Sequence, residues 1–327
     1  MKYVLGIDQG GTKTHAMIAD ENGNVLGLAQ SGGACHSTQG LSVSMNMVEE
    51  AVEAALKQSG ITLSQISAVT AGMTGLDWKE EKVLLTQALQ KLFPAQSIQV
   101  VNDCIIAMRA GTHKKRCCVL CAGTGLNCAI RKDDTQEFIY GFYISEEHQG
   151  GYALGKKTLQ KIFDAEVGLQ PPTLLTEMLL EFFQVADVTT LLKRTVTGGI
   201  DTGKKTEIPL LLEQAAEKND MLALHILEEY GRSIARYVIG GLKRFDMLSE
   251  EIEVILSGSI FKLKLPVLLD ALSAEIHRFA VHAKIINCRY EPIVGAVLMA
   301  LEQLPKPFSP QIYENIDAAK SKFRIER

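Results

Sequence analysis

A short run of glycine and polar residues near the start of the chain could bind phosphate. Asp8 ends an apolar stretch and is followed by Gln9-Gly10-Gly11-Thr12-Lys13. Glycines let backbone N–H groups approach phosphate oxygens, and Thr12 and Lys13 add a hydroxyl and a positive charge. Asp8 is placed to hold Mg²⁺ through water, because this ion keeps much of its hydration shell. An ordinary hairpin turn is the alternative for the same residues.

A second turn of similar composition, Gly123-Thr124-Gly125, follows the apolar run of residues 116–122. Two such turns could hold one triphosphate from both sides. The turns are not Walker A loops, because the spacing GxxxxGK[ST] is missing. They are not dinucleotide-binding fingerprints either, because each turn leads into a strand rather than a helix.

Asp103 follows the apolar run of residues 97–102 and precedes a helical segment. A carboxylate there could accept a proton from a sugar hydroxyl, since phosphoryl transfer needs mainly positioning and charge neutralisation. Aspartate is also a common N-cap residue, so a structural role is the alternative. Gly258-Ser259, a turn that opens a helix after residues 253–256, could let a nucleotide lie against the backbone.

The elements that must position these residues occur in the same order twice. Three strands (3–8, 15–20 and 24–30) precede alternating helices and strands (41–59, 66–72, 79–92, 97–102 and 104–111). Three further strands (116–125, 126–133 and 137–143) precede helices at 151–167, 173–184, 208–217 and 219–245, strands at 253–258 and 283–288, and a helix from Pro292. Residues 202–206 suggest a mobile surface loop.

This order predicts two α/β lobes with mixed, mostly parallel sheets flanked by helices and a ligand cleft between them. We expect residues 1–112, with a tail from about 304 to 327 packed back on them, to form the N-terminal lobe. Residues 113–303 would form a helix-rich C-terminal lobe. A chain of 327 residues is long enough for two cores of ordinary size.

Composition excludes several classes of protein. The formal net charge of −4, without a long basic run, disfavours a nucleic-acid partner. The chain has neither a signal segment nor an apolar run of the roughly 20 residues that span a bilayer, so we expect a cytoplasmic protein without a membrane partner. Seven cysteines, an odd number, suggest reduced thiols. The run Cys117-Cys118-x-x-Cys121 indicates a buried strand rather than a metal site, because no second pair of ligands lies nearby.

The order of the motifs resembles a known family. Asp-x-Gly-Gly-Thr, Asn-Asp, Ala-Gly-Thr-Gly, Ser-Gly-Ser and Glu291-Pro-Ile-Val-Gly-Ala296 are similar to the motifs of the N-acetylglucosamine kinases and the wider BadF/BadG ATPase group, over residues 5–301. The resemblance implies an actin-like (ribonuclease H-like) fold with ATP between two lobes. It also implies a homodimer and transfer of phosphate from Mg-ATP to the 6-hydroxyl of N-acetylglucosamine or a related amino sugar.

The resemblance also implies roles for individual residues. Asp103 would be the catalytic base, and residues 292–296 would form a connecting hinge helix. ATP and Mg²⁺ would be bound by Asp8, Gly10, Gly11, Thr12, Lys13, Gly123, Thr124, Gly125, Gly258 and Ser259. The sugar would contact His36, Ser37, Thr74, Asp103, Glu147 and His148.

Two segments depart from the family pattern. Glu147 and His148 stand where the family has Asp and Glu, and His36 lies in a loop that commonly carries Asn. The sugar therefore stays open among N-acetylglucosamine, glucosamine, N-acetylmuramic acid and glucose.

Two other functions are open. One is a BadF-type ATPase that drives a conformational change in a partner enzyme, but Cys104 has no matching cysteine for the cluster that such activators share. The other is a non-catalytic sugar sensor, which would not need Asp8, Asp103 and both glycine turns. No DNA-binding extension precedes Met1, which disfavours the repressor relatives of sugar kinases.

Overall fold

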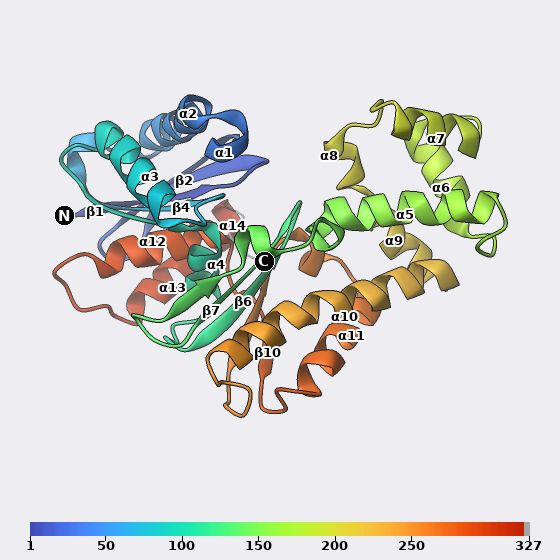
Figure 1. The fold of residues 1–327 in the computed structure, drawn as a ribbon. Helices are drawn as coiled ribbons and strands as arrows, with labels where there is room; N and C mark the ends of the chain where they lie inside the picture. Colours follow the sequence, from blue (N-terminus) through green and yellow to red (C-terminus); the bar gives the residue numbers. More distant parts are fainter. Residues whose placement is uncertain (324–327) are drawn as a thin grey trace. The chain divides into compact units, whose positions relative to one another are not determined.

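The computed structural model describes residues 1–323, which contain two five-stranded sheets (Figure 1). The strand orders are β3-β2-β1-β4-β5 and β8-β7-β6-β9-β10. Each sheet therefore places its first three strands in reverse order beside its last two, which confirms the repeat seen in the sequence. The chain divides into two units: residues 1–119 with the segment from 286 onward, and residues 120–285.

The first sheet brings the ends of three parallel strands to one edge. Its strands are β1 (Tyr3–Gln9), β2 (Lys13–Asp20), β3 (Val25–Gly32), β4 (Ile66–Met73) and β5 (Ser97–Asn102). β1 pairs with β4 and β4 with β5 in parallel, whereas β1–β2 and β2–β3 are antiparallel, so this sheet is mixed without a parallel majority. Gln9 is in register with Met73, and Met73 with Asn102. The residues next to these strand ends therefore lie along one edge.

Helices cover both faces of the first sheet. The helices of the first unit are α1 (His36–Gln39), α2 (Leu41–Ser59), α3 (Lys79–Leu92), α4 (Asp103–Gly111), α12 (Pro292–Glu302), α13 (Gln311–Ala318) and α14 (Lys320–Phe323), with a 3₁₀ turn at Leu63–Gln65. On one face, α2 and α3 pack on the strands through a buried cluster that includes Leu5, Ile7, Ile18, Val48, Val52, Leu85 and Leu89. On the other face, the absence of a side chain at Gly6 leaves room for Val297 of α12.

The chain passes from the first unit to the second after residue 119 and returns to the first unit near residue 286, not near 304 as the sequence suggested. α12 is buried from Ile293 to Leu301, and Gly295 packs directly on the backbone of Ile106 in α4. Residues 292–296 are therefore part of the first unit. The expected return of the tail is confirmed within the described residues: Lys306 Nζ and Asn315 Nδ2 each donate a hydrogen bond to Asn22 at 2.7 Å.

The second unit combines its sheet with seven of the fourteen α-helices in residues 1–323. Its strands are β6 (Cys117–Ala122), β7 (Leu126–Arg131), β8 (Glu137–Ile139), β9 (Glu253–Ser257) and β10 (Lys284–Asn287). Its helices are α5 (Gly150–Glu166), α6 (Leu174–Phe183), α7 (Val188–Val196), α8 (Thr202–Lys205), α9 (Ile208–Glu217), α10 (Met221–Arg244) and α11 (Pro266–His277), with 3₁₀ turns at Gly141–Tyr143, Glu146–His148 and Ser259–Lys262. α6 to α9 gather beside α5, and α10 lies along α11 (Figure 1).

Three local predictions differ from the structure of this unit. The strand expected at 137–143 ends at Ile139, because Gly141 adopts a positive φ of 49° and starts a 3₁₀ turn. The loop expected at 202–206 contains the short helix α8, and Lys205 packs against Gly155 of α5. The helix α7 was not predicted. None of the helices in residues 1–323 has the length and apolar character needed to cross a membrane.

Candidate functional site

Asp8, Thr74 and Asp103 lie at the edge of the first sheet where the three parallel strands end. Asp8 is the penultimate residue of β1, Thr74 follows β4, and Asp103 follows β5. The N–H of Thr74 donates to the carbonyl oxygen of Gln9 at 2.9 Å, which ties the loop after β4 to β1. The hydroxyl of Thr74 hydrogen-bonds to the carboxylate of Asp103. The structure thus brings together three residues that the sequence singled out.

Asp103 is the first residue of α4 but not its N-cap. Asn102 is the cap, because its Oδ1 accepts a hydrogen bond from the N–H of Cys104 at 2.9 Å. The structural role that the sequence left open for Asp103 therefore belongs to its neighbour. The carboxylate of Asp103 is held at the helix start by Cys104 N–H and Thr74.

The carboxyl group of Asp103 is set to titrate near neutral pH. Its pKa is raised from 3.8 to about 7, mainly by burial and then by the negative charges of Asp8 and Asp77. The hydrogen bonds from Cys104 and Thr74 oppose this rise. A carboxylate with such a pKa can take up a proton from a hydroxyl at neutral pH, as general bases do.

The first glycine turn is a tight hairpin between β1 and β2. Gly10 N–H donates to Lys13 O at 2.9 Å, and residues 11–13 are exposed. Gly33 packs directly on the backbone of Thr12 and Lys13. An exposed glycine-containing turn beside the carboxylate of Asp8 suits a phosphate and its metal ion.

Asp8 is the carboxylate that could serve a metal ion at this turn. Its side chain is 17% exposed, and its Oδ2 lies 3.9 Å from Nδ1 of His15. Within residues 1–323 no group of three or more His, Cys, Asp or Glu is arranged to hold a metal. A magnesium ion at Asp8 would therefore take most of its ligands from phosphate oxygens and water, which suits its preference for hydration.

The loop that carries His36 and Ser37 lies against the loop after β4. Gly75, at φ 74°, packs on the side chains of Cys35 and His36. His36 is buried, and its Nε2 is 3.4 Å from Oε1 of Glu81 in α3. Neither of its ring nitrogens has a hydrogen-bond partner among residues 1–323. His36 is thus not the surface histidine that its loop position suggests in isolation, whereas Ser37 is exposed.

Asp77 and Glu81 also lie at this edge, although no sequence motif singled them out. Glu81 Oε2 accepts hydrogen bonds from the N–H groups of Asp77 and Trp78 at 2.8 and 3.1 Å. The pKa of Asp77 is raised to about 6, chiefly by burial and then by Glu81, against the opposing effects of His36 and Asn102. The signal that could have found Glu81 is its place three residues into a helix, where a side chain reaches back to cap the start.

The second glycine turn and the Gly258-Ser259 turn lie together in the second unit. Gly123 N–H donates to Gly125 O at 2.9 Å, and Gly151 N–H at the start of α5 donates to Gly123 O at 2.7 Å. Gly258, at φ 101°, packs on the backbone of Ala122 at the end of β6. A side chain at Gly258 would therefore be both strained and obstructed.

Glu147 and His148 form a 3₁₀ turn that is anchored to α10. His148 Nδ1 is 2.8 Å from the hydroxyl of Tyr237, and the Tyr230 hydroxyl donates to His148 O at 2.9 Å. Burial and then the charges of Arg236 and Lys157 lower the pKa of His148, which favours the neutral form of its imidazole. Glu147 is exposed.

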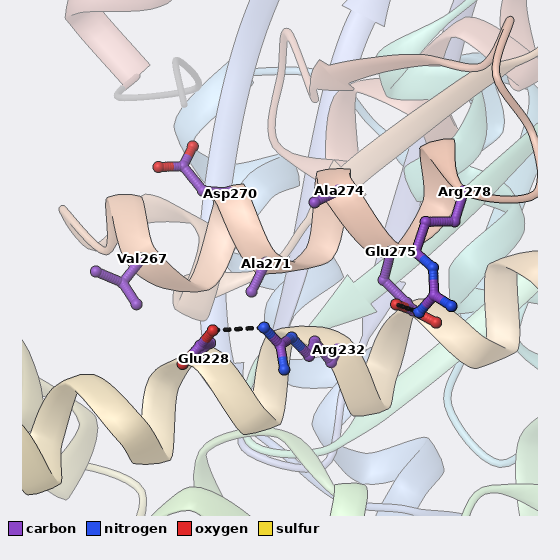
Figure 2. Close-up of a pocket in the computed structure, with 8 residues that line it drawn as sticks. All are labelled: Glu228, Arg232, Val267, Asp270, Ala271, Ala274, Glu275 and Arg278. Atoms are coloured by element: carbon purple, nitrogen blue, oxygen red, sulfur yellow. Dashed lines mark hydrogen bonds and ion pairs between the residues drawn. The ribbon is translucent and has the colours of Figure 1, made fainter.

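The pocket drawn in Figure 2 lies elsewhere in the second unit, between α10 and α11. It has a volume of about 550 Å³ and carries both signs of charge, including the pair Arg232–Glu228 at 2.6 Å. Its lining residues are Glu228, Arg232, Val267, Asp270, Ala271, Ala274, Glu275 and Arg278. It holds none of the predicted site residues.

Comparisons with known proteins agree with the fold and the motifs. The chain is 24% identical over 302 residues to the N-acetylmuramic acid/N-acetylglucosamine kinase of Clostridium acetobutylicum, covering 92% of this chain and 98% of the relative. It is 25% identical over 312 residues to the N-acetyl-D-glucosamine kinase of Dictyostelium discoideum, covering 91% and 97%. A solved structure assigned as an N-acetylglucosamine kinase from Chromobacterium violaceum superposes with a TM-score of 0.71 at 20% identity, covering 92% of this chain and 99% of the other.

The last likeness, together with the repeated five-stranded sheet, confirms the actin-like fold. The segment that carries Asp8, Asp103 and both glycine hairpin turns is also the segment recognised by a family model. Residues 5–148 match the BadF/BadG/BcrA/BcrD ATPase family, as the order of the motifs predicted.

Proposed function

We propose that this chain is an ATP-dependent sugar kinase that transfers the γ-phosphate of Mg-ATP to the 6-hydroxyl of N-acetylglucosamine or a related amino sugar. The observation that carries the proposal is Asp103, held beside Asp8 and Thr74 with a pKa of about 7. Two relatives named as kinases of N-acetylated amino sugars, each aligned over more than nine-tenths of the chain, support the reaction class.

Asp103 would act as the general base. Its carboxylate would accept the proton of the attacking sugar hydroxyl, while Thr74 and the Cys104 N–H keep it oriented. Because phosphoryl transfer needs little covalent help, correct placement of the hydroxyl and neutralisation of phosphate charge supply most of the rate. Mg²⁺, when bound, would neutralise part of that charge, and Asp8 would hold it through water.

The glycine turns would bind the nucleotide. The exposed residues 11–13 of the first turn would contact phosphate oxygens, and Lys13 would add a positive charge. In the second unit, residues 123–125 and the neighbouring Gly258-Ser259 would contact the nucleotide.

Polar side chains that the sequence singled out would bind the sugar. His36 is buried with ring nitrogens able to exchange hydrogen bonds with a hydroxyl, and Thr74 and exposed Ser37 lie in the same part of the first unit. Glu147 and His148 are further candidates for hydrogen bonds to the sugar hydroxyls. These five residues are the ones we would vary to change the choice of sugar.

The proposal includes a homodimeric, cytoplasmic protein. All seven cysteines are free thiols, as in proteins of reducing compartments. The helical region of residues 208–245 offers a surface for a second copy. Light scattering of the purified chain would give twice the monomer mass if this part is right and the monomer mass if it is wrong.

ADP release from Mg-ATP over a panel of amino sugars and hexoses, with a control lacking sugar, tests the proposed function. Strong stimulation by one amino sugar, with phosphate found on its 6-hydroxyl by NMR, is the expected result. Hydrolysis that ignores every sugar would instead favour the ATPase that drives a partner enzyme. Cys104 speaks against that second function, because its side chain is fully buried at the start of α4 and out of reach of a shared cluster.

A further inference from the structure

Asn102 joins three parts of the first unit through a single side chain. Its Nδ2 donates to the carbonyl oxygen of Leu76 and to Oδ1 of Asp77, both at 3.1 Å, and its Oδ1 accepts from Cys104 N–H at 2.9 Å. The side chain is buried, with the residue 1% exposed. Asn102 therefore fixes the start of α4 to the loop after β4, and Asp103 is the next residue along the chain.

Asp77 occupies a place that is costly for a carboxylate. It is half-buried, and burial and Glu81 disfavour its charged form, raising its pKa to about 6. A carboxyl group in such surroundings adds little to stability, and groups of this kind gather at functional sites. Together with the carbonyl oxygen of Leu76, Asp77 supplies an acceptor that holds the amide group of Asn102 in one orientation, with its oxygen toward Cys104.

The loop from 74 to 77 contacts both Asp103 and Asn102. Thr74 at the start of this loop hydrogen-bonds to the Asp103 carboxylate, and Asp77 at its end hydrogen-bonds to Asn102. Glu81 closes the arrangement by accepting from the N–H of Asp77. The same short loop thus contacts Asp103 directly through one residue and indirectly through another.

We propose that Asp77 is a positioning residue, which through Asn102 holds the start of α4, and with it Asp103, against the loop that carries Thr74. This inference rests on the proposed function, in which Asp103 takes the proton from the sugar. It assigns to Asp77 no contact with sugar or nucleotide. Its loss should therefore lower turnover while leaving the binding of both substrates nearly unchanged.

The test compares Asp77→Ala with Asp77→Asn at pH 8, where Asp103 is largely ionised in the unaltered chain. The amide of Asp77→Asn keeps an oxygen that can accept from Asn102, whereas Asp77→Ala removes it. Asp270→Ala, at an exposed position of α11, is the matched control. We expect Asp77→Ala to lower kcat about 10- to 100-fold, the effect of a displacement of the order of 1 Å. Asp77→Asn should keep kcat within about threefold, and the KM values for sugar and ATP should stay within about twofold in both variants.

A second readout does not depend on activity. The Cys104 N–H is bound to Asn102 Oδ1, so its hydrogen exchange, followed by NMR, reports whether the start of α4 is held. We expect faster exchange in Asp77→Ala and unchanged exchange in Asp77→Asn and Asp270→Ala.

Three results would overturn the inference: unchanged kcat and exchange in Asp77→Ala, a rise in KM without a fall in kcat, or an equal loss in Asp77→Asn and Asp77→Ala. If the unaltered chain transfers phosphate to no sugar, the proposed function fails. The exchange of the Cys104 N–H then still decides whether Asp77 holds the start of α4.

Discussion

Replacing Asp103 by Asn should make the protein more stable at pH 8 and no more stable at pH 4. The carboxyl of Asp103 has a folded-state pKa of about 7 against 3.8 for an unperturbed aspartate. An acid whose pKa is raised by folding contributes its full stability below pH 4 and loses it as the pH rises through 7. The uncharged side chain of Asp103→Asn avoids that loss.

The pKa difference sets the size of the effect. About three pKa units at 1.36 kcal/mol each give a ceiling of about 4 kcal/mol at pH 8. Asp103 is partly exposed, so water screens part of this penalty and we expect about 2 kcal/mol. For a unit of this size, each kcal/mol raises the Tm by about 2–4 °C.

Thermal unfolding of the unaltered chain and Asp103→Asn, followed by circular dichroism from pH 4 to pH 8, measures this difference. Asp270→Asn, which removes an exposed carboxylate far along the chain, serves as the control and should show no such trend. A difference between Asp103→Asn and the unaltered chain that stays constant over this pH range would refute the assignment of a raised pKa to Asp103. A loss of stability of Asp103→Asn relative to the unaltered chain as the pH rises would refute it as well.

Three further predictions concern activity and binding. The pH profile of kcat/KM should fall on its acid side with a midpoint near 7, because Asp103 must be ionised to accept a proton; a midpoint near 4 would contradict this. Gly258→Ala should cost about 1–3 kcal/mol of stability and raise the KM for ATP, because residue 258 has a φ of 101° and the new side chain would meet the Ala122 backbone. Unaltered ATP binding by calorimetry would argue against a nucleotide contact at this turn. Tyr237→Phe removes the 2.8 Å hydrogen bond to His148. It should raise the KM for sugar several-fold, the effect of losing one hydrogen bond, and leave the KM for ATP unchanged. Equal changes in both KM values would argue against a sugar contact at His148.

The sequence predicted those elements whose local pattern and tertiary environment agree. The helix expected at 41–59 is α2, with Val48, Val52 and Ala55 on its buried side. The strand expected at 97–102 is β5 without change. The glycine turns and the Asn-Asp pair were found because turn residues at strand ends carry information that does not depend on distant contacts.

Other features depend on packing that no short segment reveals. α12 belongs to the first unit because Gly6 and Gly295 allow it to approach β1 and α4, which lie far away in sequence. Residues 202–206 read as a loop because glycine and lysine dominate them, yet Lys205 packs on Gly155.

The candidate site was predicted only in part for the same reason. Asp103 could be singled out from its place between a strand and a helix. Its raised pKa and its proximity to Asp8, Thr74 and Asp77 arise only when three strand ends meet at one edge. His36 is buried beside Glu81, a contact that spans 45 positions of the chain and that sequence spacing does not suggest.

Single-turnover transfer of the γ-phosphate by Asp103→Asn is the most direct test of the central claim. The variant would be mixed with Mg-ATP and the best sugar from the panel, and its ATP affinity would be measured separately by calorimetry. We expect a loss of transfer of at least about 100-fold, within the usual range for removal of a general base, with ATP affinity unchanged. Transfer at the rate of the unaltered chain would contradict the role of Asp103 as general base, because the sugar hydroxyl would then be activated without it.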